Sequence, residues 1–274
     1  MKIGDKNFND LNKTWVFGIL NATPDSFSDG GKYTKIDLAL KHTHRMIKEG
    51  ADIIDVGGES TRPGYEPVSI EQEIQRVCPI IEKIKAEFDI PISLDTQKSA
   101  VAKAGIQAGA SLINDIWGLK KDKNMAKVIA KSKVSCCLMH NKSNASYQNL
   151  IFDVVMDLKE SVEIALEKGI DKDKICIDPG IGFGKTVAQN LELINNLELL
   201  KILKFPILLG ASRKSFIGAA LDLPVGERLE GTLATTALAV FKGISFVRVH
   251  DVKENVRIIR MLEAIKKYES YKGK

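Results

Sequence analysis

The stretch 175–180, Ile-Cys-Ile-Asp-Pro-Gly, decides the fold, because its pattern recurs along the whole chain. Its apolar residues predict a short buried strand, which Asp178 ends before Pro179 and Gly180 turn the chain. A carboxylate at the exit of a buried strand adds little stability, yet it lies where parallel α/β sheets and barrels bind ligands. Other apolar runs are likewise followed by a polar residue, a loop and a helix.

Eight short apolar runs are expected to be the strands of one sheet. They cover residues 16–20, 52–56, 91–94, 111–113, 134–139, 175–177, 206–209 and 245–249. Their apolar residues are continuous, which is typical of strands covered on both faces and hence parallel. Eight strand–helix units in roughly 250 residues match the number of units and the chain length that are typical of a TIM barrel. We therefore predict one TIM-barrel domain over residues 1–274, with a short N-terminal lead that forms a hairpin around Gly4-Asp5.

Several helix boundaries can be predicted from caps. Ser69 and Gln72 form a capping box that begins a helix ending near Glu87, and Thr34 with Asp37 resembles a capping pair that begins a helix running toward Glu49. Further helices are expected at about 98–108, from about 149 to 169, after Ser215 and at the basic C-terminus.

An open, doubly wound sheet is the alternative fold. Such a sheet normally carries a phosphate-binding fingerprint after its first strand, and Asn21-Ala22-Thr23-Pro24 does not match it. The glycine-rich segment 180–186 also fails as a nucleotide motif. A P-loop needs a glycine where Pro179 stands, and a dinucleotide fingerprint needs one where Lys185 stands. ATP and NAD are therefore not expected as ligands.

The composition is that of an ordinary globular protein, with 44% hydrophobic residues, 27% charged residues and a formal net charge of +5. No basic run is interleaved with aromatic residues, so nucleic acid is not expected as a partner, whereas small anionic substrates suit the charge. The polar start lacks a signal peptide's apolar core, and no apolar stretch approaches the ~20 residues of a membrane helix. Cys78, Cys136, Cys137 and Cys176 form no CxxC pair, which predicts reduced thiols in a cytoplasmic protein.

Polar side chains at or just beyond the strand ends are the main functional signal. One such residue is often a helix cap, but seven on one barrel rim are hard to explain as caps, and this rim is where TIM barrels carry out catalysis. Two carboxylates, two amides and three possible cations suit a ligand with a donor- and acceptor-rich ring and an anionic end. The seven are Asn21, Asp95, Asn114, Asp178, Lys214, Arg248 and His250.

Two further segments are suited to anions. The segment 212–215, Ser-Arg-Lys-Ser, leads into an apolar helix, and backbone N–H groups at a helix start attract negative charge. An ordinary N-cap with a solvated lysine is the simpler interpretation of this segment taken alone. The loop segment 61–64, Thr-Arg-Pro-Gly, offers a second cation near the same rim.

Eight segments in order resemble those of the dihydropteroate synthase family over nearly the whole chain. The matching segments lie at 18–31, 55–64, 93–96, 113–116, 138–140, 178–184, 210–218 and 248–251. The resemblance implies a TIM barrel that joins 6-hydroxymethyl-7,8-dihydropterin diphosphate to 4-aminobenzoate, releasing diphosphate and 7,8-dihydropteroate. It also implies Mg²⁺ as cofactor, a homodimer and inhibition by sulfonamides, which imitate aminobenzoate.

The resemblance also assigns roles to individual residues. Asp178 would accept from the pterin 2-amino and ring N–H groups, and Arg248 would lie flat on the ring and hold a phosphate. The pterin set comprises Asp95, Asn114, Ile116, Met139, Asp178, Gly210, Lys214 and Arg248. The diphosphate set is Asn21, Thr61, Arg62, Arg248 and His250, with Asn21 toward the metal, and the aminobenzoate set is Phe27, Pro63, Phe183, Lys214 and Ser215.

The implied chemistry needs no enzyme nucleophile. We expect diphosphate to leave first, with Asp95 and Asp178 stabilising the pterin methylene cation before the arylamine attacks. The catalytic set is then Asp95, Asp178, Lys214, Arg62 and His250. Loops 22–33 and 57–68 are expected to close over the site and exclude water.

Two alternatives remain open. A pterin-binding methyltransferase that moves a methyl group from methyltetrahydrofolate to a corrinoid protein would share the barrel and its pterin contacts. It has no need of the Thr-Arg-Pro loop or the Ser-Arg-Lys-Ser segment, and both are intact. A non-catalytic pterin-binding paralogue should have lost a residue such as Arg62 or Lys214, and neither is lost.

Overall fold

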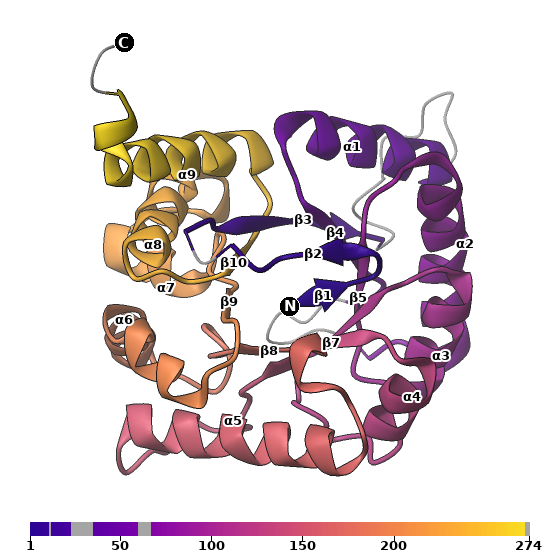
Figure 1. Cartoon of the computed structure of the whole chain (residues 1–274). Coiled ribbons are helices and arrows are strands. Elements are labelled where there is room, and N and C mark those ends of the chain that lie inside the picture. Colours follow the sequence, from indigo (N-terminus) through magenta and orange to yellow (C-terminus); the bar gives the residue numbers. More distant parts are fainter. Residues whose placement is uncertain (11, 23–34, 60–66, 272–274) are drawn as a thin grey trace.

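The computed structural model describes residues 1–10, 12–22, 35–59 and 67–271. In these residues a parallel sheet runs in the order β8-β7-β6-β5-β4-β3-β10-β9, and helices surround it as an outer ring (Figure 1). The strands of the sheet are β3 (Trp15–Asn21), β4 (Ile53–Gly57), β5 (Ile92–Asp95), β6 (Leu112–Asp115), β7 (Ser135–Met139), β8 (Ile175–Asp178), β9 (Leu208–Leu209) and β10 (Phe246–Val249).

The helices follow the strands in alternation, as the strand–helix pattern predicts. They are α1 (Lys35–Glu49), α2 (Ile70–Glu87), α3 (Ser99–Ala108), α4 (Met125–Ser132), α5 (Leu150–Glu167), α6 (Val187–Asn195), α7 (Ser215–Leu221), α8 (Leu229–Phe241) and α9 (Val252–Lys266). Short 3-10 turns lie at Lys172–Lys174, Leu197–Leu203, Val225–Glu227 and Tyr268–Tyr271.

The sheet closes on itself between its two end strands. Ile177 forms a parallel bridge with Ile207, and its N–H donates to Pro206 O at 2.9 Å. This closure confirms the TIM barrel and excludes the open, doubly wound sheet. The seventh strand is shorter than the predicted 206–209, because Pro206 has no N–H for a ladder and Ile207 makes one isolated bridge.

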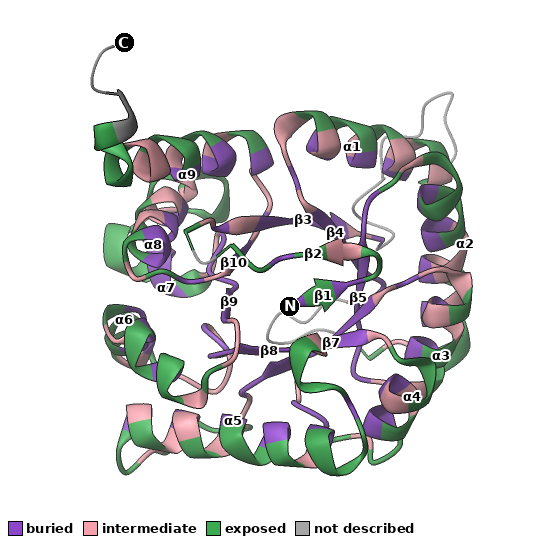
Figure 2. Cartoon of the chain, in the orientation of Figure 1, coloured by how far each residue is buried: buried purple, intermediate pink, exposed green. Residues whose placement is uncertain are grey.

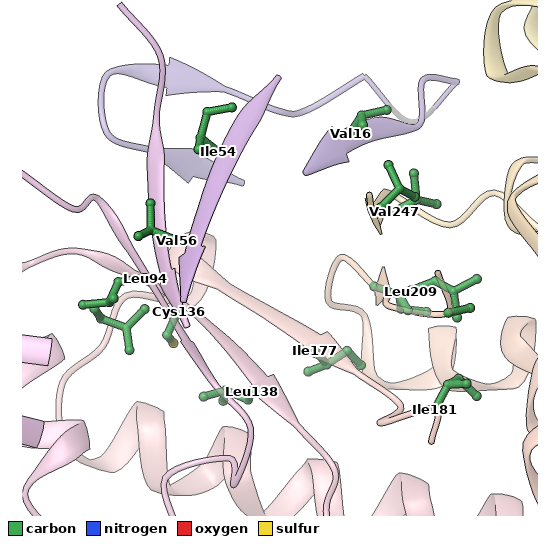
Figure 3. Close-up of a cluster of buried hydrophobic side chains, with 14 of the residues drawn as sticks. Val16, Ile54, Val56, Leu94, Cys136, Leu138, Ile177, Ile181, Leu209 and Val247 are labelled. Carbon is green, nitrogen blue, oxygen red and sulfur yellow. The ribbon is translucent and has the colours of Figure 1, made fainter. Parts of the chain in front are cut away.

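Alternate side chains of each strand face outward and pack against the helices. Val16, Ile54, Leu94 and Leu138 belong to this shell of buried hydrophobic residues (Figure 3). The strands are buried along their length, whereas each surrounding helix is buried on one face and exposed on the other (Figure 2). Two-sided burial is the reason why the apolar runs are continuous.

The inward side chains divide into two layers. The layer nearest the strand starts is apolar and includes Phe17 and Phe246, whose rings meet edge to face at 5.4 Å between centroids. The predicted hairpin is present as β1 (Lys2–Ile3) and β2 (Lys6–Asn7), and it lies across this end of the barrel (Figure 1). Ile3 and Phe8 pack into the apolar layer, so the lead closes the lower end of the interior.

The predicted capping box is confirmed. Ser69 accepts from the Gln72 N–H at 3.2 Å, and the Gln72 side chain accepts from the Ser69 N–H. A second box, formed by Thr186 and Gln189, begins α6. The four cysteines are free thiols. Among the described helices, none is long and apolar enough to cross a membrane.

Candidate active site

The register of the sheet aligns the polar strand ends in one row. Asn21 is paired with Gly57, Gly57 with Asp95, and Asp95 with Asn114 across four neighbouring strands. Farther round the barrel, Met139 is paired with Asp178. The predicted rim of polar residues therefore exists, and several of them are the last residues of their strands instead of the first residues of the loops.

A cluster of buried charges lies in the second, upper layer of the barrel interior, nearer the carboxyl ends of the strands. Arg248 Nε donates to Asp55 Oδ2 at 2.6 Å, and its Nη2 donates to Asp95 Oδ2 at 2.8 Å. Burial raises the pKa of Asp95 to about 7, and Arg248 opposes that rise. Burial also disfavours the charge of Arg248, yet Asp55 and Asp95 raise its pKa above the ordinary value.

Two buried oxygens of this cluster have no hydrogen-bond partner among the described residues. They are Asp95 Oδ1 and Asn114 Oδ1, and both side chains are almost completely buried. A buried acceptor left unpaired costs about 1–3 kcal/mol, so native proteins seldom keep one without a reason. Donors on a bound ligand would satisfy both atoms.

Asp178 and Lys214, here called the second rim pair, are groups of opposite charge that interact electrostatically at the rim. Asp178 Oδ1 accepts from the Gly180 N–H at 2.7 Å, while burial raises the pKa of the carboxyl against the pull of Lys214. Burial lowers the pKa of Lys214 to about 8, and Asp178 opposes this. The Lys214 ammonium donates to Ile181 O and lies 4.4 Å from the Phe183 ring centroid.

Gly210 is close to the same pair. A Cβ built on Gly210 would lie 3.6 Å from Asp178 Oδ2, an ordinary contact distance, so the backbone passes beside the carboxylate. Met139 is the buried last residue of β7, and Ile116 is a buried residue directly after β6. Gly210, Met139 and Ile116 therefore lie near the rim, and their contact with a pterin stays a prediction.

The remaining described candidates lie at the edge of this arrangement. Ser215 is the exposed first residue of α7, and Lys214 precedes it as the N-cap. His250 Nδ1 lies 3.0 Å from the Ser212 hydroxyl, which also accepts from the His250 N–H. Asn21 is partly buried at the end of β3.

Four predicted residues lie outside the described part of the chain. They are Phe27, Thr61, Arg62 and Pro63, and the loops 22–33 and 57–68 fall largely in the same segments. The structure therefore leaves these predictions untested.

Asp55 is a member of the charge cluster that the pattern of strand ends did not reveal. It stands in the middle of β4, fully buried, and the Ser93 hydroxyl donates to its second oxygen. A signal was present in the sequence, because an acidic residue between Ile54 and Val56 is costly in a buried strand unless it has a partner.

Comparisons with known proteins identify the family to which this chain belongs. A family model described as pterin binding enzyme matches residues 17–250. A dihydropteroate synthase of Clostridium beijerinckii (strain ATCC 51743 / NCIMB 8052) is 62% identical over 266 residues, which cover 97% of this chain and 99% of that protein. The barrel and its rim thus define a pterin-binding enzyme.

Solved structures show which family of pterin-binding enzymes the chain resembles. A Clostridium difficile dihydropteroate synthase, crystallised in the presence of pteroic acid, superposes with a TM-score of 0.90 and 50% identity over 92% of this chain and 97% of that one. A Yersinia pestis dihydropteroate synthase in a sulfonamide drug complex gives a TM-score of 0.90 and 40% identity over 98% and 99% of the two chains. The chain belongs to the dihydropteroate synthase family, transferases of folate biosynthesis.

Proposed function

We propose that this rim joins 6-hydroxymethyl-7,8-dihydropterin diphosphate to 4-aminobenzoate, with release of diphosphate and 7,8-dihydropteroate. The observation that carries the proposal is the pair of unpartnered buried oxygens on Asp95 and Asn114, in the same charged layer as Arg248. A pterin is a flat ring rich in N–H donors and acceptors, so it can supply the missing donors.

The pterin is bound mainly by carboxylates and one lysine in this proposal. The Gly180 N–H donates to only one oxygen of Asp178, Oδ1. The carboxylate can therefore still accept from the 2-amino and ring N–H groups of the pterin. Lys214 donates to the oxygen side of the ring, while Ile116, Met139 and Gly210 line the slot. Asp95 and Asn114 bind the other ring nitrogens.

Arg248 serves both ends of the pterin substrate. Its Nε and Nη2 are directed to Asp55 and Asp95, which fix the guanidinium plane. Nη1 makes no hydrogen bond to the described residues and can donate to a phosphate oxygen. Asn21, His250, Thr61 and Arg62 complete the diphosphate contacts.

The second substrate lies nearer the loops. Phe27, Pro63 and Phe183 would form the walls around the aminobenzoate ring, and Lys214 with Ser215 would hold its carboxylate. Sulfonamides imitate this substrate, so they would compete for the same place.

Mg²⁺ fits the site only as an ion shared with the substrate. No group of three or more His, Cys, Asp or Glu side chains in the described residues could hold a metal by itself. Magnesium, however, commonly uses one or two protein oxygens together with substrate phosphates, and Asn21 offers one such oxygen at the rim. When bound, the ion would neutralise charge on the diphosphate.

The proposed reaction is dissociative. The bond between the pterin methylene carbon and the diphosphate oxygen breaks first, and its electron pair leaves with the diphosphate, aided by Arg62 and His250. Asp95 and Asp178 stabilise the methylene cation electrostatically. The aminobenzoate nitrogen then donates its lone pair to the methylene carbon, and the extra proton passes to water or diphosphate.

Diphosphate release tests this function. The purified protein is mixed with the pterin substrate and Mg²⁺, with and without 4-aminobenzoate. Release that depends on aminobenzoate, falls with chelator and returns with added Mg²⁺ supports the proposal. Pterin binding without such release would instead favour the corrinoid methyltransferase or the non-catalytic paralogue.

A cytoplasmic homodimer is the proposed assembly. Exposed apolar side chains occur on α8 and α9, among them Phe241 and Met261, which are 57% and 61% exposed. Such side chains gathered on neighbouring helices favour a protein partner, and a second copy is the simplest one. Light scattering should give twice the chain mass, and Phe241→Glu should shift the protein toward the monomer.

A further inference from the structure

Lys185 follows the glycine-rich turn that fails as a nucleotide motif, and no role proposed so far uses it. Its ammonium lies 2.8 Å from Gly180 O, 3.0 Å from Phe183 O and 2.9 Å from His140 Nδ1. An ammonium has three donors and no acceptor. Each donor therefore has one acceptor, and the geometry fits a cationic lysine.

The third acceptor requires a neutral histidine. His140 is fully buried, and burial together with Lys185 lowers its pKa to about 2. Its Nδ1 can then accept from Lys185. Burial lowers the pKa of Lys185 to about 7, and Asp178 opposes this.

The turn that Lys185 holds contacts both charged groups of the second rim pair. The Gly180 N–H donates to Asp178, and Ile181 O accepts from Lys214. Phe183, whose ring faces the Lys214 ammonium, is in the same turn. Two of the three acceptors of Lys185 are carbonyls of this turn, so the lysine fixes its inner side.

The backbone of the turn contains three glycines, which are conformationally permissive, so contacts from other segments have to fix its shape. Gly180, Gly182 and Gly184 all have positive φ, at 70°, 83° and 53°. The Tyr147 hydroxyl donates to Gly184 O at 2.9 Å and holds the outer end of the turn. Lys185 contacts the part that lies next to Asp178.

We propose that Lys185 is a positioning residue of the transfer reaction, which fixes turn 180–184 so that Asp178 and Lys214 face the pterin. The inference rests on the proposed function, because that function assigns the pterin to these two residues. Lys185 itself contacts no substrate in this account. It acts through the backbone of the turn.

Pteroic acid binding, measured by calorimetry, tests the inference together with steady-state kinetics. Lys185→Met keeps the length of the side chain and removes all three donors. Its dissociation constant for pteroic acid and its KM for the pterin substrate should both rise about tenfold, the size expected for lost hydrogen bonds of a charged group. The matched control is Lys142→Met, which removes a nearby ammonium that lies 4.6 Å from the Tyr147 ring centroid. The control should change both constants by less than about twofold.

The outcomes separate positioning from stability. A Lys185→Met protein with a lower melting temperature but wild-type dissociation constant and KM would overturn the inference. If that variant does not fold, Lys185→Leu is measured instead, since it also removes all three donors, and wild-type constants there would overturn the inference equally. Failure of the proposed function is seen separately, as absence of aminobenzoate-dependent diphosphate release from the wild-type protein.

Discussion

Replacement of Arg248 by methionine should destabilise the fold more than any surface charge change. Arg248 is bonded to Asp55, which is 0% exposed, and to Asp95, which is 8% exposed. Methionine keeps most of the volume but leaves both carboxyls buried without their cation. Removal of one partner of a buried ion pair typically costs about 3–5 kcal/mol, so we expect a loss of about 4 kcal/mol near pH 8.

The loss should grow as the pH rises. Burial already raises the pKa of Asp95 to about 7, and loss of Arg248 would raise it further. A carboxyl with a folded pKa above its unfolded value keeps a proton that the unfolded chain releases, so stability falls as pH rises between those values. Each further unit by which the pKa of Asp95 rises adds about 1.4 kcal/mol to the loss of unfolding free energy, and this additional loss develops mostly above pH 7.

Urea unfolding, followed by circular dichroism at pH 6 and pH 8, measures both effects. Arg213→Met is the matched control, because Arg213 pairs with Asp251 at 2.6 Å but is 33% exposed. Its loss should be about 1 kcal/mol or less at either pH. An Arg248→Met loss as small as that of the control, or the same at both pH values, would refute the reasoning about the buried cluster.

Three further predictions concern single residues. In the unmodified protein, kcat/KM should rise as Asp95 loses its proton near pH 7. Asp95→Asn should abolish this rise and lower turnover about 100-fold, and wild-type turnover in the variant would contradict the electrostatic role of Asp95. Lys98→Met leaves Glu73, which is 0% exposed and 2.6 Å from the ammonium, without its cation, so urea unfolding should show a loss of about 3 kcal/mol. Gly180→Ala places a Cβ 1.9 Å from a backbone carbonyl oxygen and should lower the melting temperature by several degrees, whereas Gly226→Ala, with open space around it, should not.

The parts of the fold that local rules govern could be predicted from the sequence. The Ser69–Gln72 box needs only residues three apart, and the hairpin at Gly4-Asp5 needs only a turn between two short strands. The row of polar strand ends could also be predicted, since parallel strands of a barrel bring their carboxyl ends to one rim. Asp95 and Asn114 are neighbours in register for this reason.

Contacts between distant segments could not be predicted in this way. Lys185 meets His140, which lies 45 residues away, and two carbonyls whose direction depends on glycine backbone angles. The sequence pattern of the turn instead raised the question of a nucleotide. Arg248 likewise bonds Asp55 across 193 residues, and only the closed barrel brings the two together.

The division of the barrel interior into an apolar and a charged layer explains how such a site is tolerated. Ile3 and Phe8 close the lower end, where inward side chains are apolar and supply burial without polar cost. The charged groups therefore lie above this apolar layer, where Arg248 forms ion pairs with both Asp55 and Asp95. The oxygens that stay unpaired, on Asp95 and Asn114, lie at the rim end of their strands. Ligand donors can reach them from that side, and the cost of leaving them unpaired is removed when a substrate binds.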